Sequence, residues 1–309
     1  MNKLVSTKNI DHESWLRYRK QGIGGSDAGA ICGLNPYASP MTVFVDKTMD
    51  VVEEKDSESM RQGRDLEEYV ARRFAEATGK QVRRSNYMYS NEEYPFMLAN
   101  VDRMVVGENA GLECKTASAY STDQWKDGSV PPHYYIQCCH YMAVTGADAW
   151  YLAVVILGRA FQYIRIDRDE RVIDDLISVE KEFWEEHVQK RIPPTPDGSP
   201  ATEKMLKEFY PSASEGKTIV LEGYESRLQR YSEINPLIDK LEKEKAQIEQ
   251  EIKAQMQDAE MAQAGQYLIK WTQADQTRLD SRRLKEEEPA IYTAYSRTVP
   301  QRRFSIRAA

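Results

Sequence analysis

The chain has 309 residues, of which 41% are hydrophobic and 29% charged, and its formal net charge is −7 at pH 7. This length and composition fit one large soluble domain, or one domain with an extension, and exclude a larger assembly of domains. No apolar run approaches the ~18 residues that a membrane span needs, and the acidic charge counts against a protein that coats DNA nonspecifically. An enzyme that holds DNA in one basic channel is compatible with these numbers.

The N-terminal sequence MNKLVSTKNIDHESW lacks the apolar segment and the cleavage site of a secretory signal. We therefore expect a cytoplasmic protein without membrane segments.

The first half of the chain predicts a helix followed by three strands. Ser59–Gly79 carries apolar residues at helical spacing and stops at a glycine, which is typical of a helix end. Three short apolar stretches follow, separated by the turn-forming sequences NEEYP and GENAG. We expect a meander of three consecutive strands, at Val82–Tyr89, Phe96–Val106 and Leu112–Thr116.

The next segments predict a helix, a hairpin and a second helix. Pro132–Gly146 is apolar, begins with proline in its first turn and ends at glycine. Trp150–Leu157 and Phe161–Ile166 read as two strands around a Gly-Arg turn, and Asp167–Lys190 as a long amphipathic helix. The proline-rich stretch 191–200 marks a boundary.

Beyond this boundary the composition changes. Gly223–Ala262 is rich in Glu, Lys and Gln with apolar residues near heptad spacing, which predicts a long helix, or a helical hairpin jointed at Asn235-Pro236. The tail is expected to form two strands, at 266–273 and 301–307, with a helical segment at 282–296 between them. We therefore divide the chain into a mixed α/β core, 1–200, and a helical, basic extension, 201–309.

The strongest chemical signal is the segment LANVDRMVVGENAGLECKTAS, in which an acidic strand residue, Asp102, precedes a turn and the sequence Glu-x-Lys. Side chains alternate along a strand, so Glu113 and Lys115 point to one face while Cys114 points away. A hairpin can bring Asp102 beside Glu113. Two neighbouring carboxylates, with the backbone carbonyl of Cys114, suit Mg²⁺.

Such an ion activates a bound water and shields the charge that develops on a phosphodiester, while the ammonium of Lys115 orients the nucleophile. This arrangement predicts metal-assisted hydrolysis. The alternative is a solvated hairpin in which Lys115 is only the ion-pair partner of Asp102 and Glu113, and spacing alone leaves both interpretations open.

These residues resemble the PD-(D/E)xK nuclease motif, and their surroundings resemble the lambda-exonuclease/YqaJ family along nearly the whole chain. The similar segments are IGGSDAGAICGLNPYASPMTVFVDK, QGRDLEEYVARRF, YYIQCCHYMAVTGADAWYLAVV and the tail from residue 264 to residue 307. The resemblance implies a restriction-endonuclease-like core, with a mixed central sheet flanked by helices, and a helical C-terminal extension.

By position, the resemblance makes Glu67 the helix carboxylate of the active site, as a second or a water-mediated metal ligand, and Gln137 the active-site glutamine. Without the resemblance, Glu67 is a solvated helix residue and Gln137 a buried, hydrogen-bonded one. The chain departs from the family pattern at two positions: Val101 replaces the proline that names the motif, and Glu68 stands where the family often has proline.

Arg19 and Ser26 match a basic residue and a serine that contact the terminal 5′ phosphate of DNA in the exonuclease. Arginine suits phosphate through its fork of donors, and the two glycines before Ser26 allow backbone N–H groups to approach an anion. Alternatively, Gly24-Gly25-Ser26 only caps a helix that begins near Asp27.

Other cofactors are not expected. The four cysteines lack the spacing that holds an iron–sulfur cluster in related nucleases and are predicted to be free thiols, and the four histidines lack zinc-site spacing. The cysteines are Cys32, Cys114, Cys138 and Cys139, and the histidines are His12, His133, His140 and His187.

The family resemblance implies a Mg²⁺-dependent alkaline exonuclease, with Mn²⁺ as a substitute ion, that acts on ends of double-stranded DNA in a bacterial or phage-infected cell. It would degrade one strand from the 5′ end and leave 3′ single-stranded tails for recombination with a single-strand annealing recombinase. A ring-shaped homotrimer is the implied assembly. The alternatives are a structure- or sequence-specific endonuclease and a non-catalytic scaffold that binds DNA ends.

Overall fold

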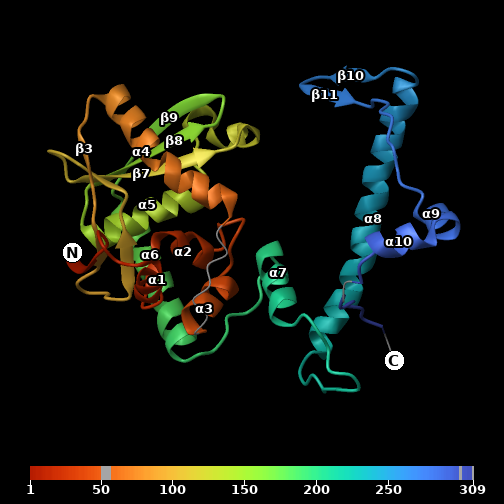
Figure 1. Ribbon diagram of the computed structural model, residues 1–309, viewed down its shortest axis with the longest axis horizontal. Helices are drawn as coiled ribbons and strands as arrows, with labels where there is room; N and C mark the ends of the chain where they lie inside the picture. The colour runs from red at the N-terminus through yellow and green to blue at the C-terminus, as the bar shows by residue number, and fades with distance from the viewer. Residues whose placement is uncertain (50–56, 299–300, 308–309) are drawn as a thin grey trace. The chain divides into compact units, whose positions relative to one another are not determined.

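The computed structural model describes residues 1–49, 57–298 and 301–307 and divides the chain into two units, Met1–Phe209 and Tyr210–Ala309 (Figure 1). None of the helices in these described ranges is both long enough and apolar enough to cross a membrane. The assignment of residues 1–200 as a nuclease core and of 201–309 as its extension stays a prediction.

A five-stranded sheet forms the centre of the first unit. Its strands are, in spatial order, β3 (Val82–Arg84), β6 (Arg103–Val105), β7 (Ala110–Ala117), β8 (Ala149–Ile156) and β9 (Ala160–Asp167). Only the pair β7 and β8 is parallel, and the others in this sheet are antiparallel. A parallel pair needs a long crossover, which here contains helix α5 (Pro132–Thr145).

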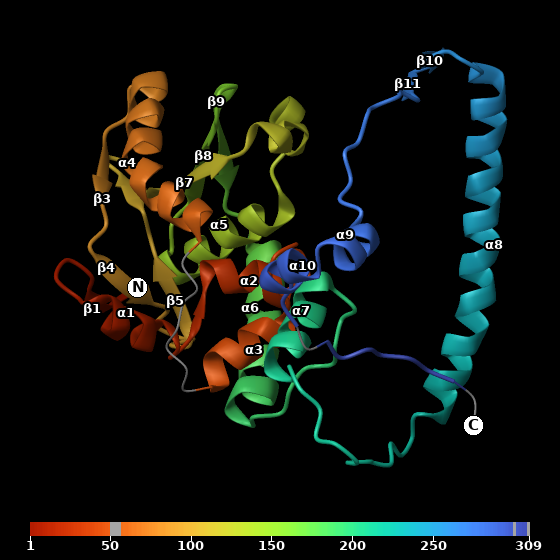
Figure 2. The same cartoon turned by 45° about the vertical axis from the view of Figure 1, so that its right-hand side comes forward.

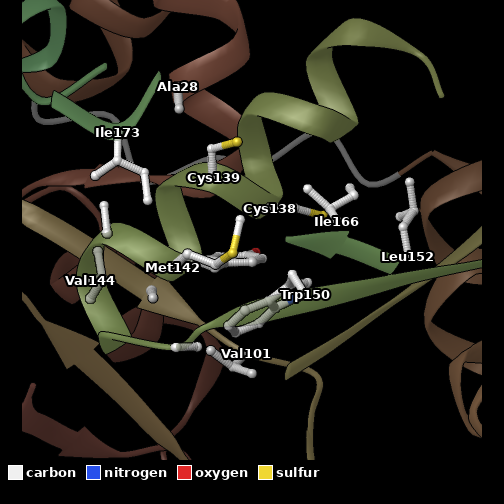
Figure 3. Close-up of a cluster of buried hydrophobic side chains, with 14 of the residues drawn as sticks. Ala28, Val101, Cys138, Cys139, Met142, Val144, Trp150, Leu152, Ile166 and Ile173 are labelled. Atoms are coloured by element: carbon white, nitrogen blue, oxygen red, sulfur yellow. The ribbon is translucent and has the colours of Figure 1, made fainter. Parts of the chain in front are cut away.

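Helices cover both faces of this sheet, with α4 (Glu58–Thr78) on one side and α5 on the other (Figure 1 and Figure 2). Every residue of β8 is buried. Because side chains alternate, Trp150 and Leu152 pack with α5, as Figure 3 shows, while Tyr151 and Ala153 pack with α4. The strand predicted at Trp150–Leu157 is therefore confirmed as the core of the fold.

The two covering helices have the ends that their sequences predict. The Ser57 hydroxyl accepts a hydrogen bond from the Met60 N–H at the start of α4, and Gly79 ends the helix at φ 71°. Helix α5 begins with Pro132 and ends at Gly146, also at φ 71°. Both predicted helices are confirmed.

The predicted three-strand meander is wrong, because two of its strands break and enter different sheets. Val82–Tyr89 divides into β3 and β4 (Tyr87–Ser90), and Phe96–Val106 divides into β5 (Met97–Asn100) and β6. Strands β4 and β5 belong to a second sheet with β1 (Asn2–Ser6) and β2 (Ile23–Gly24), in the order β1-β4-β5-β2.

Both halves of the second broken strand, β5 and β6, carry buried residues, so Phe96–Val106 reads as one continuous apolar run. The chain changes sheet between β5 and β6. As a result Asp102 lies at a bend between two strands and not inside a strand as predicted.

Further helices and a 3-10 segment complete the described part of this unit. They are α1 (His12–Arg19), α2 (Gly25–Ile31), α3 (Pro40–Thr48), a 3-10 segment (Ala119–Gly128), α6 (Glu170–Glu182) and α7 (Pro200–Phe209). The helix predicted at Asp167–Lys190 is confirmed, and its last part, Phe183–Gln189, is a π-helix. Helix α7 is held to α3 by the Thr202 hydroxyl, which donates to the Ser39 hydroxyl at 2.8 Å.

Helix α5 is fixed by a buried polar pair. His140 Nδ1 lies 2.8 Å from Glu180 Oε1 on α6, and His140 Nε2 donates to the Leu98 carbonyl of β5 at 2.8 Å. Burial opposes the charge, but Glu180 raises the pKa of His140. This pair ties one helix to a neighbouring helix and to the second sheet.

In the second unit, the helix α8 (Glu225–Met256) is continuous and passes through Pro236. The helical hairpin that the sequence left open is therefore not formed. A hairpin of β10 (Met261–Ala264) and β11 (Tyr267–Lys270) follows, which confirms the first tail strand. The predicted helical segment 282–296 divides at proline into α9 (Ser281–Glu287) and α10 (Pro289–Tyr295). The strand predicted at 301–307 is wrong, because this alternating segment pairs with no described strand.

Candidate active site

A cavity of about 890 Å³ opens in the first unit beside β7. Its walls come from α1, α4, β7, α5 and the bend at Asp102. The cavity therefore collects residues from segments that lie far apart in the sequence. The polar and aromatic side chains in the wall include His12, Trp15, Arg64, Glu67, Asp102, Glu113, Lys115 and Tyr134.

Glu113 lies in β7 and is 4% exposed. Its Oε1 atom lies 2.6 Å from Lys115 Nζ and accepts a hydrogen bond from Gln137 Nε2 at 2.8 Å. Its Oε2 atom is buried and has no hydrogen-bond partner among the described residues. A buried carboxylate oxygen without a partner is costly, so this atom is well suited to bind a cation.

Asp102 lies next to this carboxylate. Its Oδ2 atom accepts a hydrogen bond from the Cys114 N–H at 2.9 Å, which fixes the bend against β7. Burial, together with the charges of Glu113 and Glu67, raises the pKa of Asp102 well above its ordinary value. Crowded carboxylates of this kind are stabilised by a bound cation, and oxygen ligands suit Mg²⁺. The structure thus brings Asp102 and Glu113 together in a set that fits a divalent ion.

Lys115 is the cation of this group. Its ammonium contacts Glu113 and lies 4.7 Å from the centre of the Tyr134 ring. Although burial favours the neutral amine, Glu113 raises the pKa of Lys115 above its ordinary value. The side chain therefore stays protonated and faces the cavity with Glu113, as the alternation along β7 predicts.

Gln137 approaches from α5 and is 5% exposed. Its Nε2 group donates to Glu113 Oε1 and to the Tyr141 hydroxyl, both at 2.8 Å. Helix α2 packs closely over this pair, because a side chain at Gly25 would lie 2.6 Å from the Tyr141 ring and 3.0 Å from Gln137 Cγ. The glycine at position 25 is required by this contact.

Glu67 lines the same cavity from α4, but its carboxylate is held by Arg103. Arg103 also donates from Nη2 to Glu68 Oε2 at 2.8 Å. Within the described part of the chain, no three His, Cys, Asp or Glu side chains are grouped as a metal-binding set. The structure therefore places Glu67 at the site without joining it to Asp102 and Glu113 as a third ligand.

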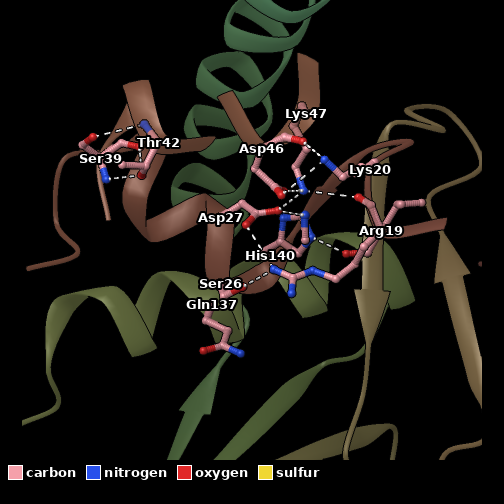
Figure 4. Close-up of polar contacts among 12 residues, drawn as sticks. Arg19, Lys20, Ser26, Asp27, Ser39, Thr42, Asp46, Lys47, Gln137 and His140 are labelled. Carbon is pink, nitrogen blue, oxygen red and sulfur yellow. Dashed lines mark hydrogen bonds and ion pairs between the residues drawn. The ribbon is translucent and has the colours of Figure 1, made fainter. Parts of the chain in front are cut away.

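Arg19 and Ser26 lie together near Gln137, as Figure 4 shows. Arg19 Nη2 donates to Ser26 Oγ at 3.3 Å and lies 3.4 Å from Asp27 Oδ1. Ser26 does not cap α2, because the N-cap is Gly24 and its N–H donates to Asp27 Oδ2 at 2.9 Å. The side chain that stabilises the start of α2 is therefore that of Asp27 and not that of Ser26. Ser26 lies at the surface.

Asp27 is anchored by a buried lysine. Lys47 Nζ lies 2.7 Å from Asp27 Oδ2 and also donates to the Arg19 carbonyl at 3.2 Å. Burial would raise the pKa of Asp27, but Lys47 and Arg19 lower it to about 2. Asp27 therefore stays ionised and holds the Arg19 guanidinium in place.

Several site residues were not anticipated from the sequence. They include Arg103, Tyr141, and the stacked pair His12 and Trp15, whose ring centroids are 5.8 Å apart in the cavity wall. A signal for Arg103 was present, since it shares the alternation of Val101 and Val105, which are both buried. A buried charge needs a partner of opposite charge, and Arg103 has two, the partly buried Glu67 and the exposed Glu68.

The chain is similar to known proteins along nearly its whole length. The sequence profile of the YqaJ-like viral recombinase domain matches residues 14–148. The uncharacterized protein YqaJ of Bacillus subtilis (strain 168) is 39% identical over 308 residues, which cover 98% of this chain and 97% of YqaJ.

Among solved structures, the alkaline exonuclease LHK-Exo from Laribacter hongkongensis matches with a TM-score of 0.50 and 17% identity, over 64% of this chain and 99% of LHK-Exo. LHK-Exo in complex with dAMP matches with a TM-score of 0.51 and 19% identity, over 64% of this chain and 97% of that chain. The expected mixed α/β fold with helix-flanked sheets is thereby confirmed.

Proposed function

The chain belongs to the YqaJ-like viral recombinase family, and from that premise we propose that it is a metal-dependent DNA exonuclease whose active site is the cavity beside β7. The observation that carries this proposal is the pairing of Asp102 with Glu113, whose buried Oε2 atom has no partner among the described residues. The fold shared with an alkaline exonuclease supports it.

The proposed metal ligands are the carboxylates of Asp102 and Glu113 and the backbone carbonyl of Cys114, with Glu67 acting through water. Mg²⁺ suits this small set of oxygen ligands, because it keeps several waters and commonly uses one or two carboxylates, and Mn²⁺ is the proposed substitute. When bound, such an ion makes a water more acidic and shields the charge of the cleaved phosphodiester.

The protein's own groups would orient the reaction. Lys115 stays protonated beside Glu113 and can stabilise negative charge on the attacked phosphate or orient the attacking water. Gln137 holds Glu113 Oε1 from α5 and leaves Oε2 for the metal. In this proposal Lys115 stabilises the transition state, and Gln137 positions the carboxylate of Glu113.

We further propose that Arg19 and Ser26 bind the 5′ phosphate of a DNA end and so set the 5′-to-3′ polarity. Contacts with Asp27 hold the guanidinium of Arg19 near Ser26. The product would be a 3′ single-stranded tail for a single-strand annealing recombinase, made by a homo-oligomer, a ring trimer in the family resemblance. The reaction would take place in the cytoplasm.

The experiment that tests this function compares linear and covalently closed circular duplexes, with Mg²⁺ or with EDTA. We expect mononucleotide release from the linear duplex in Mg²⁺ and none from the circle or in EDTA. Cleavage of the circle would identify an endonuclease. Binding to ends without hydrolysis in any metal would identify a scaffold, and either result overturns the proposal.

A further inference from the structure

We propose that Arg103 is a built-in cation that takes the place of a second metal ion beside Glu67, so that the active site binds one divalent ion and not two. This inference rests on the proposed metal site and concerns the number of ions in it. Arg103 is a positioning residue, since it touches the site's carboxylate and backbone and not the reacting atoms.

The guanidinium of Arg103 is enclosed. Its side chain is 3% exposed, on β6, directly after Asp102. Nη1 contacts Glu67 Oε1 and donates to the Asp102 carbonyl at 2.8 Å, and Nη2 donates to Glu68 Oε2 at 2.8 Å. One side chain therefore joins two adjacent carboxylates of α4 to the bend that carries Asp102.

These contacts commit the Glu67 carboxylate to Arg103. Charge-assisted hydrogen bonds to a guanidinium are strong, and a buried guanidinium that loses a carboxylate is left poorly compensated. Arg84 adds a second positive charge, with Nη2 3.9 Å from Glu67 Oε1 and 3.4 Å from Glu68 Oε2. Moving Glu67 to a metal ion would require breaking this arrangement.

The charges that remain are sufficient for one ion. Among the residues that the structure describes, three carboxylates line the cavity: Glu67, Asp102 and Glu113. Arg103 compensates Glu67, and Lys115 compensates Glu113 at its Oε1 atom. What is left is Asp102 and the unpartnered Oε2 atom of Glu113, which belong to residues that line the same cavity and together suit a single hard divalent cation.

The inference is tested by counting ions in the full chain by isothermal titration calorimetry with Mn²⁺, and with Ca²⁺ after a short 5′-phosphorylated duplex has bound. We expect one ion per chain in both states, and none in Glu113→Gln. Two ions in the wild type would overturn the inference while leaving the proposed function intact. No ion in the wild type would instead remove the proposed function and this inference with it.

The role of Arg103 itself is tested by Arg103→Met, with thermal melting to confirm the fold. Removing the cation should free Glu67, so we expect a second ion to bind. Arg103→Lys keeps a positive charge and should stay at one ion, which also provides a result if Arg103→Met fails to fold.

The double variant Arg103→Met/Glu67→Gln should return to one ion, because the second ion depends on the freed Glu67. The matched control, Arg103→Met/Glu68→Gln, should keep two, since Glu68 does not line the cavity. A folded Arg103→Met variant that still binds one ion, or a charge-keeping Arg103→Lys variant that binds two, would show that Arg103 does not limit the number of ions.

Discussion

The two units of this chain differ in what they bury. Met1–Phe209 encloses three clusters of apolar side chains, together with buried charged groups such as Glu113 and Arg103. Among the described residues of Tyr210–Ala309, Met256 is the one buried hydrophobic side chain, and Leu241 in the middle of α8 is 64% exposed.

This difference in burial determines which carboxylates need a bound cation. A carboxylate held in a packed core loses water, so its charge must be met by a cation, a metal or a donor. The same side chain on a solvated helix has water as a partner, and an ion pair there contributes little. The catalytic groups should therefore all lie in the first unit, and substitutions in the second should leave the reaction step nearly unchanged.

The largest expected effect is the loss of a proposed metal ligand. Asp102→Ala or Glu113→Ala should lower metal-dependent hydrolysis by at least about 10³-fold, the upper range for removing one electrostatic stabiliser, while DNA still binds. Initial rates on a linear duplex, with circular dichroism to verify folding, measure this. A folded variant with near-normal hydrolysis would place the site elsewhere.

A smaller loss is expected at Lys115. Lys115→Ala should slow cleavage by about 10²-fold and leave DNA affinity nearly intact, because the ammonium acts mainly on charge that develops in the transition state. Single-turnover rates and binding isotherms separate the two quantities. If affinity falls as much as the rate does, Lys115 is mainly a phosphate anchor.

The variant Arg19→Ala tests whether this arginine binds the 5′ phosphate of a DNA end. Arg19→Ala should reduce the preference for a 5′-phosphorylated over a 5′-hydroxyl duplex by about tenfold, as expected for one charged hydrogen bond. Arg282→Ala in α9 of the second unit is the matched control and should keep the wild-type ratio. The ratio is measured at one salt concentration, since phosphate contacts are salt-sensitive. An unchanged ratio in Arg19→Ala would move end recognition to other residues.

The buried Asp27 predicts a pH dependence of stability. Folding lowers its pKa from 3.8 to about 2, so its contribution is complete above about pH 4 and is lost as the pH falls towards 2. Between about pH 4 and pH 2, Asp27 should account for about 2 kcal/mol of the decrease in the free energy of unfolding. Urea unfolding at several pH values should show that Asp27→Asn is less stable near neutrality and declines less. An equal decline in both proteins would contradict the assignment.

The sequence was sufficient for the residues whose geometry is local. Glu113 and Lys115 share a face because alternation is a property of any strand, and β7 is regular from Ala110 to Ala117. The ends of α4 and α5 were predictable for the same reason, since the glycine and proline that mark them act on the neighbouring backbone.

The residues that were missed depend on contacts between distant segments. The position of Asp102 at a bend follows from β5 and β6 belonging to different sheets, and both read as one apolar stretch because both are buried. The partners of Arg103 lie 35 and 36 residues away on α4. The alternation of Val101, Arg103 and Val105 signals an inward charge, but only the fold shows which carboxylates meet it.

The central claim is that the catalytic machinery lies wholly in the first unit, and shortening the chain tests it most directly. A protein that ends at Phe209 keeps every residue that lines the cavity and all three apolar clusters. At saturating linear duplex in Mg²⁺, its kcat should stay within about threefold of the full chain, since surface changes away from a site shift energies by only ~0.5 kcal/mol. A folded, DNA-bound 1–209 protein whose kcat falls by about 10²-fold, the loss of one electrostatic stabiliser, would show that the second unit supplies part of the active site.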